Sequence, residues 1–463
     1  MGHNRKTAGL HSSNKWLAAA ILTIFTVTFL CYAITLKHGF ILNWDDYDYI
    51  VRNKAIRSFS LANLQIVFST YFVGNYAPFH LISYMIDYQL WGLDPAGYHF
   101  VNILLHALNG ILVYRLLLQL ELSEMPSLLG AIVFVLHPVQ VESVAWVSER
   151  KNVLSALFFL LALLRYIAYR RASSGHVKNY ALSLVFLTCA LLSKSAAVVF
   201  PLVIICYDLC FRDEKHPLKL VDKLPFLLLA LAASILTIMS QAAGVGGGRM
   251  GYPGGTPLTT LWTMIPVFIS YLRDLVYPLD LSPYYMVPIR KSVDWEVVMS
   301  AGLFFSLAGI AVISAKRWPR LFFFLAVYMI SLLPVMQIIP LLTLKNDRYL
   351  YFPMIGIAGV TALLISVLMQ GSIRLRNTVV VISVACCTVL GGITYCQSRN
   401  WKDSTTLWQF AIRRDPDNML AWLMLAKGYT NQGNAKDAVS ALTVYQELKS
   451  KFGPLRGWEG IGS

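Results

Sequence analysis

The sequence predicts an all-α polytopic membrane protein. Of its 463 residues, 57% are apolar and only 14% are charged, whereas soluble domains contain about 25% charged residues. The apolar residues form continuous runs such as LAAAILTIFTVTFLCYAITL, unlike the alternating pattern of a transmembrane β-barrel. These observations exclude a soluble globular enzyme, and the apolar content also excludes a disordered chain.

The first apolar run, residues 16–36, is long enough to cross the ~30 Å apolar core of a bilayer. It follows basic residues without an acid and lacks a clear small-residue cleavage site, so we predict an uncleaved anchor with residues 1–15 in the cytoplasm. Ten further spans are predicted near residues 98–119, 127–140, 152–170, 180–195, 196–211, 224–241, 297–315, 321–340, 349–370 and 377–396.

Eleven spans from a cytoplasmic start place the C-terminus outside the cytoplasm. Lysine and arginine gather in segments 165–178, 212–223, 316–320 and 374–376, which we assign to cytoplasmic loops. Residues 258–278 are also apolar, but a crossing there would invert the charge bias downstream. They are therefore predicted to be re-entrant or to lie on the outer face.

The net charge is +15, from 39 Lys and Arg against 24 Asp and Glu. No basic run is interleaved with aromatic residues, so the charge indicates cytoplasmic loops rather than nucleic-acid binding. The seven cysteines lie in or beside apolar runs. They form neither a disulfide framework nor a zinc motif.

Two long segments are predicted outside the cytoplasm. The first outer loop, residues 37–97, mixes charged and aromatic residues and is expected to form helices lying in the membrane interface. The second is a tail, residues 397–463, set apart from the transmembrane domain of residues 16–396 because its apolar runs stop.

The tail carries the pattern of a tetratricopeptide repeat. Its opening matches W-x2-L-G-x2-Y with alanine in the glycine place, and the match comprises Trp422, Leu425, Ala426, Tyr429, Gly433, Ala438, Tyr445 and Pro454. One repeat cannot bury its apolar face alone. We therefore expect the tail to pack on the membrane domain or on a protein partner; the alternative is an ordinary helical hairpin.

Charged residues at membrane depth are costly and usually functional. Asp45 and Asp46, in NWDDYDYI, could form a solvated turn or supply a general base. The segment HPVQVESVAWVSERKN contains His137, Glu142, Glu149, Arg150 and Lys151. Its basic residues could clamp a phosphate or anchor the chain at the headgroups.

Two further segments place cations between apolar runs. Lys194, in LLSKSA, has no acidic neighbour in sequence, so it needs an anion from a lipid headgroup or a substrate phosphate. The segment LKNDRYLYFP contains Asp347, Arg348 and Tyr349, where the arginine could pair with the aspartate or bind a phosphate. No phosphate-binding loop, dinucleotide fingerprint or HExxH motif is present, so neither nucleotide nor zinc chemistry is predicted.

A polar stripe runs along the predicted span 98–119. Its members share one helix face at spacings of three, four and three residues, and they are His99, Asn102, His106 and Asn109. The histidines are too far apart along the helix for one metal ion. We therefore interpret the stripe as interhelical hydrogen bonds.

Taken in order, these segments resemble the bacterial relatives of the transmembrane and tetratricopeptide-repeat-containing (TMTC) proteins. The resemblance rests on the Asp-Asp pair after the first span, YAPFHLISYMIDYQLWGLDPAGYHFVNILLHALN, LHPVQVESVAWVSERKNVLSALFFLLAL, LLSKSAAVVFPLVIICYD, DRYLYFP and the tail. Those proteins are similar to protein O-mannosyltransferases of the GT-C class. The resemblance implies a GT-C-like bundle of about eleven transmembrane helices with a small tetratricopeptide domain.

The resemblance also implies an activity. Members take a sugar from a polyprenyl-phosphate carrier and pass it to an acceptor hydroxyl, on a protein or a glycan, outside the cytoplasm. Mannose is the candidate sugar, and a divalent metal is left open. The first-loop acid, here Asp45 or Asp46, is the expected base, and Arg348 matches the arginine of the late loop.

The other carried-over positions are Glu142 and Lys194. Many relatives have arginine or histidine where this chain has Ala77. That basic contact is therefore either missing here or supplied elsewhere, for instance by His80. The predicted site thus has a base at Asp45 or Asp46 and no metal ligand. Its donor-phosphate contacts are Arg150, Lys194 and Arg348, and its acceptor- or sugar-orienting residues are His80, His137, Glu142 and Tyr349.

The expected partners are the lipid-linked donor, the acceptor, membrane lipids and a protein bound by the tail. Neutralisation of the departing phosphate by cations would make a general acid unnecessary, and a single displacement would invert the anomeric configuration. Two alternatives stay open. A transporter or flippase for lipid-linked glycans would show internal repeats, which the sequence lacks, and a scaffold without enzymatic activity would tolerate loss of the acid pair.

Overall fold

The protein is described by a computed structural model, which covers residues 14–172, 176–212, 218–243 and 251–453. The described residues form α-helices and short 3-10 or π turns, with no β-strand beyond one isolated bridge between Phe72 and Asn75. The all-α class is thus confirmed. Most of the predicted segment 1–15, residues 213–217 of one basic loop, and Pro454 of the repeat pattern lie outside the described residues.

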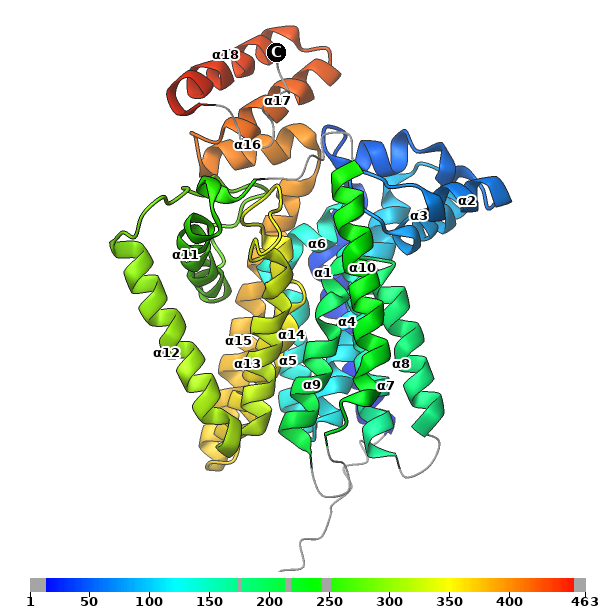
Figure 1. Ribbon diagram of the computed structural model, residues 1–463, viewed down its shortest axis with the longest axis vertical. Helices are drawn as coiled ribbons and strands as arrows, with labels where there is room; N and C mark the ends of the chain where they lie inside the picture. Colours follow the sequence, from blue (N-terminus) through cyan, green and yellow to red (C-terminus); the bar gives the residue numbers. More distant parts are fainter. Residues whose placement is uncertain (1–13, 173–175, 213–217, 244–250, 454–463) are drawn as a thin grey trace, which may run out of the picture.

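The long helices run side by side in one bundle (Figure 1). Each of the eleven predicted spans falls on a helix of this bundle, and these helices are α1 (Asn14–Tyr32), α4 (Pro95–Gln119), α5 (Glu124–Leu136), α7 (Arg150–Arg171), α8 (His176–Leu191), α9 (Phe200–Phe211), α10 (Leu224–Ala243), α12 (Trp295–Arg317), α13 (Pro319–Leu332), α14 (Pro353–Leu368) and α15 (Ile373–Ser398).

Length and composition support fewer crossings than eleven. Within the described residues, six helices are long and apolar enough to cross a membrane, and a seventh is added if α5 and the segment after it form one bent span. Shorter apolar helices cover Ser195–Phe211, Pro319–Val335 and Pro353–Leu368. The count of eleven therefore stays a prediction, although every predicted run is helical.

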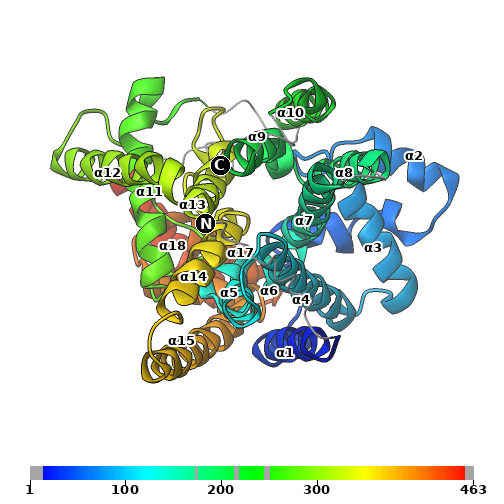
Figure 2. The same cartoon turned by 90° about the horizontal axis from the view of Figure 1, so that it is seen from below.

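Helix α11 (Pro257–Val276) covers all but the last two residues of the apolar run 258–278, which was predicted to be re-entrant or to lie on the outer face. Figure 1 shows α11 nearly end on, near the end of the bundle that carries the tail, whereas Figure 2 shows it lengthwise. Its axis therefore lies across the bundle rather than along it, as a helix on or near a membrane face would.

Small residues allow close packing at the centre of the bundle. A Cβ added to Gly130 of α5 would lie 2.7 Å from the backbone oxygen of Ala358 in α14. Close backbone approach of this kind is a common way for helices to associate in membranes, where lipid removes the hydrophobic driving force.

Three of the four residues in the polar stripe of α4, Asn102, His106 and Asn109, form hydrogen bonds to other segments, as predicted. His106 Nδ1 and Asn109 Nδ2 each lie 2.8 Å from the hydroxyl oxygen of Tyr351, and Asn109 Nδ2 also donates to the backbone oxygen of Val153 in α7. These bonds tie α4 to the segment that precedes α14. They hold together chain segments that carry the candidate site.

The first outer loop and the tail lie at the same end of the bundle (Figure 1). The loop contains α2 (Leu61–Ser69) and α3 (Pro78–Trp91) at the edge of the bundle, and the tail contains α16 (Ser404–Arg414), α17 (Met419–Asn431) and α18 (Ala435–Phe452). Helices α17 and α18 pack on each other over the predicted repeat, and α16 packs on α17. The tetratricopeptide assignment itself stays a prediction.

Candidate functional site

The site lies where the bundle meets the first outer loop. A break in α5 creates it: proline at 138 disfavours a helical His137 and cannot donate a backbone hydrogen bond, and the chain bends by 51° between α5 and the following segment. That segment contains α6 (Val141–Ala145) and a 3-10 turn, Val147–Glu149, before α7 begins. Acidic and basic side chains therefore lie at the end of the bundle.

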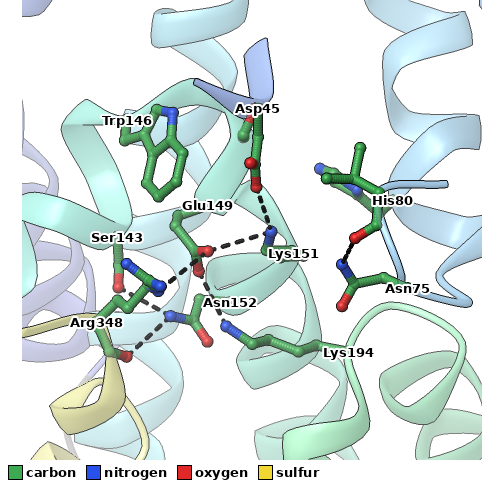
Figure 3. A network of polar contacts seen from close by, with 12 residues as sticks. Asp45, Asn75, His80, Ser143, Trp146, Glu149, Lys151, Asn152, Lys194 and Arg348 are labelled. Carbon is green, nitrogen blue, oxygen red and sulfur yellow. Dashed lines mark hydrogen bonds and ion pairs between the residues drawn. The ribbon is translucent and has the colours of Figure 1, made fainter. Parts of the chain in front are cut away.

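Glu149 is the centre of the polar network in Figure 3. Its carboxylate accepts from Lys194 Nζ at 2.9 Å and from Lys151 Nζ at 3.2 Å, and Arg348 Nε lies 3.5 Å away. The Glu149 side chain is only 2% exposed. Since a buried charge is stable only when paired, this carboxylate needs the three cations and holds them together.

Asp45 faces this network from the first outer loop. Its Oδ2 lies 3.4 Å from Lys151 Nζ, and its side chain is 25% exposed. Burial raises the pKa of the Asp45 carboxyl above its ordinary 3.8, while the Lys151 ammonium acts in the opposite direction. Asp45 therefore combines access to solvent with a carboxylate that is not fully occupied by protein donors.

Asp46 has different partners from Asp45 and is completely buried. Its Oδ2 accepts the backbone N–H of Ile41 at 2.8 Å, and its Oδ1 accepts both the backbone N–H of Ser148, at 2.9 Å, and the Ser148 hydroxyl. Burial raises the pKa of Asp46 to about 6, against these hydrogen bonds. The geometry gives Asp46 a structural role, joining the first loop to the segment before α7.

Arg348 is fixed from two sides. Its guanidinium pairs with Glu142, whose carboxylate also accepts the Arg348 backbone N–H at 2.7 Å. Asn152 Nδ2 donates to the Arg348 backbone oxygen at 2.9 Å. Asp347 instead accepts from the Tyr285 hydroxyl at 2.6 Å. Arg348 therefore pairs with Glu142 and not with Asp347, so the predicted Asp347–Arg348 pair does not form.

A cavity opens beside the network, and both lysines line it. The remaining lining residues are mostly amides and hydroxyls from the first loop, from the turn after α8 and from α10, and the full set is Asn75, Tyr76, Ala77, Lys151, Ser193, Lys194, Ser195, Thr237 and Ser240. Hydrogen-bond donors and two ammonium groups are what an anion needs. The cavity is small, about 10 Å³. Lys194 lines it, and Glu149 supplies the anion that the sequence analysis expected from a lipid headgroup or a substrate phosphate.

Arg150 lies apart from the cavity. Its guanidinium is 0% exposed and forms an ion pair with Asp87 of α3 at 2.5 Å. It also donates to Asn102 Oδ1 at 2.7 Å and to the backbone oxygen of Tyr98 at 2.8 Å. These partners enclose Arg150, so the structure favours a role in fixing α3 to α4 over the predicted phosphate contact.

The remaining predicted residues are distributed around the site. His80 is buried, with Nε2 2.8 Å from the Tyr84 hydroxyl. His137 Nε2 lies 3.0 Å from the backbone oxygen of Leu275, a contact that joins α5 to α11. Tyr349 bonds through its hydroxyl to Thr343 at 2.7 Å, and its ring lies 5.4 Å from Arg348 Cζ. Only Tyr349 among these three contacts a network residue.

The segment that contains Glu149 and Lys151 was singled out from the sequence, but within its ERKN stretch only Arg150 was assigned a role at the site. The signal that could have found them is the acid placed directly before two bases at the start of an apolar run. In the described part of the chain, no group of three or more His, Cys, Asp or Glu residues is arranged to hold a metal ion.

Residues 78–240 match the family model described as dolichyl-phosphate-mannose-protein mannosyltransferase. This stretch contains Glu149, Lys151 and Lys194 but neither Asp45 nor Arg348. The human protein O-mannosyl-transferase TMTC4 is 25% identical over 492 aligned positions, which cover 91% of this chain and 65% of that protein. The resemblance predicted from the sequence is thereby confirmed, and the chain spans just under two thirds of that relative.

Two solved structures align with most of this chain at low sequence identity. The oligosaccharyltransferase of Archaeoglobus fulgidus, tethered with an acceptor peptide, has a TM-score of 0.49 at 12% identity, covering 94% of this chain and 59% of that one. ArnT from Cupriavidus metallidurans, bound to undecaprenyl phosphate, has a TM-score of 0.44 at 14% identity, covering 97% and 78%.

Proposed function

We propose that this protein is a membrane glycosyltransferase that moves a sugar, with mannose as the first candidate, from a polyprenyl-phosphate carrier to an acceptor hydroxyl of a protein or glycan. The reaction takes place on the extracytoplasmic face. The observation that supports this most directly is the arrangement of Asp45, Lys151 and Lys194: a partly exposed carboxylate, and two ammonium groups lining one cavity.

The cations stabilise the negative charge of the leaving group. When the bond between the anomeric carbon and the phosphate oxygen breaks, the electron pair stays on the phosphate, which departs as polyprenyl phosphate with one additional negative charge. Within the described residues, the Lys194 ammonium forms an ion pair with Glu149 alone, so it retains donors for an anion in the cavity. Cations already fixed in place stabilise developing charge without reorganisation.

Asp45 acts as the general base for the acceptor hydroxyl. As the acceptor oxygen attacks the anomeric carbon, its proton passes to the Asp45 carboxylate, provided the two lie within hydrogen-bond reach. The nucleophile is the substrate's own hydroxyl, so no covalent enzyme intermediate forms. A single displacement then inverts the anomeric configuration.

The test uses purified protein in liposomes with a radiolabelled mannosyl-phosphoryl-polyprenol and a peptide rich in serine and threonine. We expect label in the peptide, and nuclear magnetic resonance of the product should show the anomeric configuration opposite to that of the donor. Retained configuration would contradict single displacement. Movement of the labelled lipid between leaflets without transfer to any hydroxyl would favour the flippase instead.

A further inference from the structure

Four tryptophans connect the tail to the candidate site. Trp44, next to Asp45, has its ring centroid 5.8 Å from that of Trp146 and 4.8 Å from that of Trp408 in α16. Trp146 in turn stacks on Trp401 at 5.8 Å. Two tail-side rings thus contact two rings of the site segments, and three of the four tryptophans are at most 3% exposed, namely Trp146, Trp401 and Trp408.

Asn43 adds polar contacts to the same junction. Its Oδ1 accepts the indole N–H of Trp408 at 3.1 Å, and its Nδ2 donates to the backbone oxygen of Met424 in α17 at 2.6 Å. The backbone N–H of Gly39 donates to the backbone oxygen of Lys402 at 2.9 Å. Residues 39–44 are therefore held against the tail immediately before the acid pair.

The other side of this short segment is fixed by the membrane domain. Asp46 bonds to Ser148, as described above, and the face of Trp146 lies 5.9 Å from Lys151 Nζ and 5.5 Å from Arg348 Cζ. Asp45 is consequently placed between two anchors. One anchor belongs to the bundle, and the other belongs to α16 and α17 of the tail.

We propose that the tail is a positioning element of the catalytic site, acting through Trp408 and Asn43 to hold Asp45 against Lys151. This proposal rests on the proposed function for its kinetic consequence, but its structural consequence can be measured independently. A tail that only recruited partners would need neither the indole packing on Trp44 nor the two side-chain bonds of Asn43.

The kinetic test compares Trp408→Ala with Trp408→Phe and with Trp422→Ala as a matched tail control. In the part of the chain that the structure describes, the Trp422 side chain hydrogen-bonds within the tail, through its indole N–H to the Pro416 backbone oxygen at 2.9 Å. A misplacement of about 1 Å can cost roughly 10²-fold in rate, so Trp408→Ala should lower kcat about 10- to 100-fold with the donor KM unchanged. Trp408→Phe, which keeps a ring but loses one hydrogen bond, should recover kcat to within about 10-fold of the parent.

The independent measurement is hydrogen–deuterium exchange of the peptide covering residues 39–48 in the full chain. Trp408→Ala should speed its exchange, and Trp422→Ala should not. If Trp408→Ala cannot be purified as a monodisperse protein, Asn43→Ala removes both side-chain bonds from the loop side and should give the same two effects.

Unchanged exchange in the variant that folds would overturn the proposal even if the parent showed no transferase activity. So would a change in donor KM alone, or an equal kcat loss in Trp422→Ala. A parent that lacks transferase activity while exchange responds as expected would instead contradict the proposed function.

Discussion

Replacing each member of the acid pair by asparagine should separate catalysis from stability. Asp45→Asn keeps the size of the side chain but removes its ability to accept a proton. General base catalysis typically contributes about 10²–10⁴-fold, so transfer should fall by that factor. The Asp45 carboxylate touches Lys151 only at 3.4 Å. Its loss should therefore leave the folded structure close to that of the parent.

Asp46→Asn should have the reverse effect. Asp46 accepts three hydrogen bonds in a fully buried position, and an asparagine amide offers one oxygen where the carboxylate offers two. The backbone N–H of Ile41 or Ser148 would then face an NH₂ group and stay unpaired. A buried unpaired donor costs about 1–3 kcal/mol, so the thermal stability should fall more than the rate.

The assay measures initial transfer rates and thermal unfolding in detergent for both variants, with donor binding as the control. We expect Asp45→Asn to unfold near the parent temperature with a rate reduced at least 100-fold, and Asp46→Asn to unfold earlier. An Asp45→Asn variant with the parent's rate would refute the assignment of the base. If both variants kept full transfer, the mechanism itself would fail, and the scaffold or transporter would replace it.

Three further predictions follow from the site and the topology. Lys194→Met removes a charge-assisted contact worth about 1.5–3 kcal/mol, so donor use should weaken roughly 10- to 150-fold, as donor titrations would measure; an unchanged donor KM would make Lys194 a headgroup anchor. Asp45 accepts a proton only when ionised, and burial raises its pKa above 3.8. The rate should therefore fall as the pH drops through a value above 3.8, and Asp45→Asn should abolish that acid limb in a pH–rate profile. An alkaline phosphatase fused after the tail should be active and a green fluorescent protein fused there dark, whereas the reverse would place the tail in the cytoplasm.

The helices could be predicted from sequence because each needs a long apolar stretch, and the apolar runs mark such stretches directly. The exact residues at which each helix begins and ends could not be predicted in this way. The run 180–195 was predicted as one span, but α8 ends at Leu191 and Lys194 lies in an extended conformation before the next 3-10 turn. Hydropathy averages over such a break because its neighbours are apolar on both sides.

The choice between adjacent charged residues required the structure. Arg150 and Lys151 are consecutive in the first turn of α7, where successive side chains point about 100° apart around the helix axis. Arg150 therefore faces Asp87 and Lys151 faces Glu149. Sequence showed two bases at one helix start but not which of them faces the cavity.

The partners of the site residues come from distant parts of the chain. Lys194 meets Glu149 across 45 residues, and Arg348 meets Glu142 across 206. Such pairs depend on how α6, α7 and the segment before α14 pack together, and one sequence contains no local pattern for them. The residue types at the site were therefore predictable, whereas the central role of Glu149 was not.

Lys151 lies beside the proposed base, Asp45, and also lines the cavity proposed for the leaving group. The charges of the site therefore stay balanced during the proposed reaction. Before reaction, the three cations are balanced by three carboxylates with which they form ion pairs: Lys151 with Asp45, Lys194 with Glu149, and Arg348 with Glu142. During transfer, Asp45 takes a proton and loses its negative charge while the departing phosphate gains one. Negative charge therefore moves from one neighbour of Lys151 toward the cavity that Lys151 also lines. The net charge of the site stays constant through the step, so a buried network can support it without admitting a counterion.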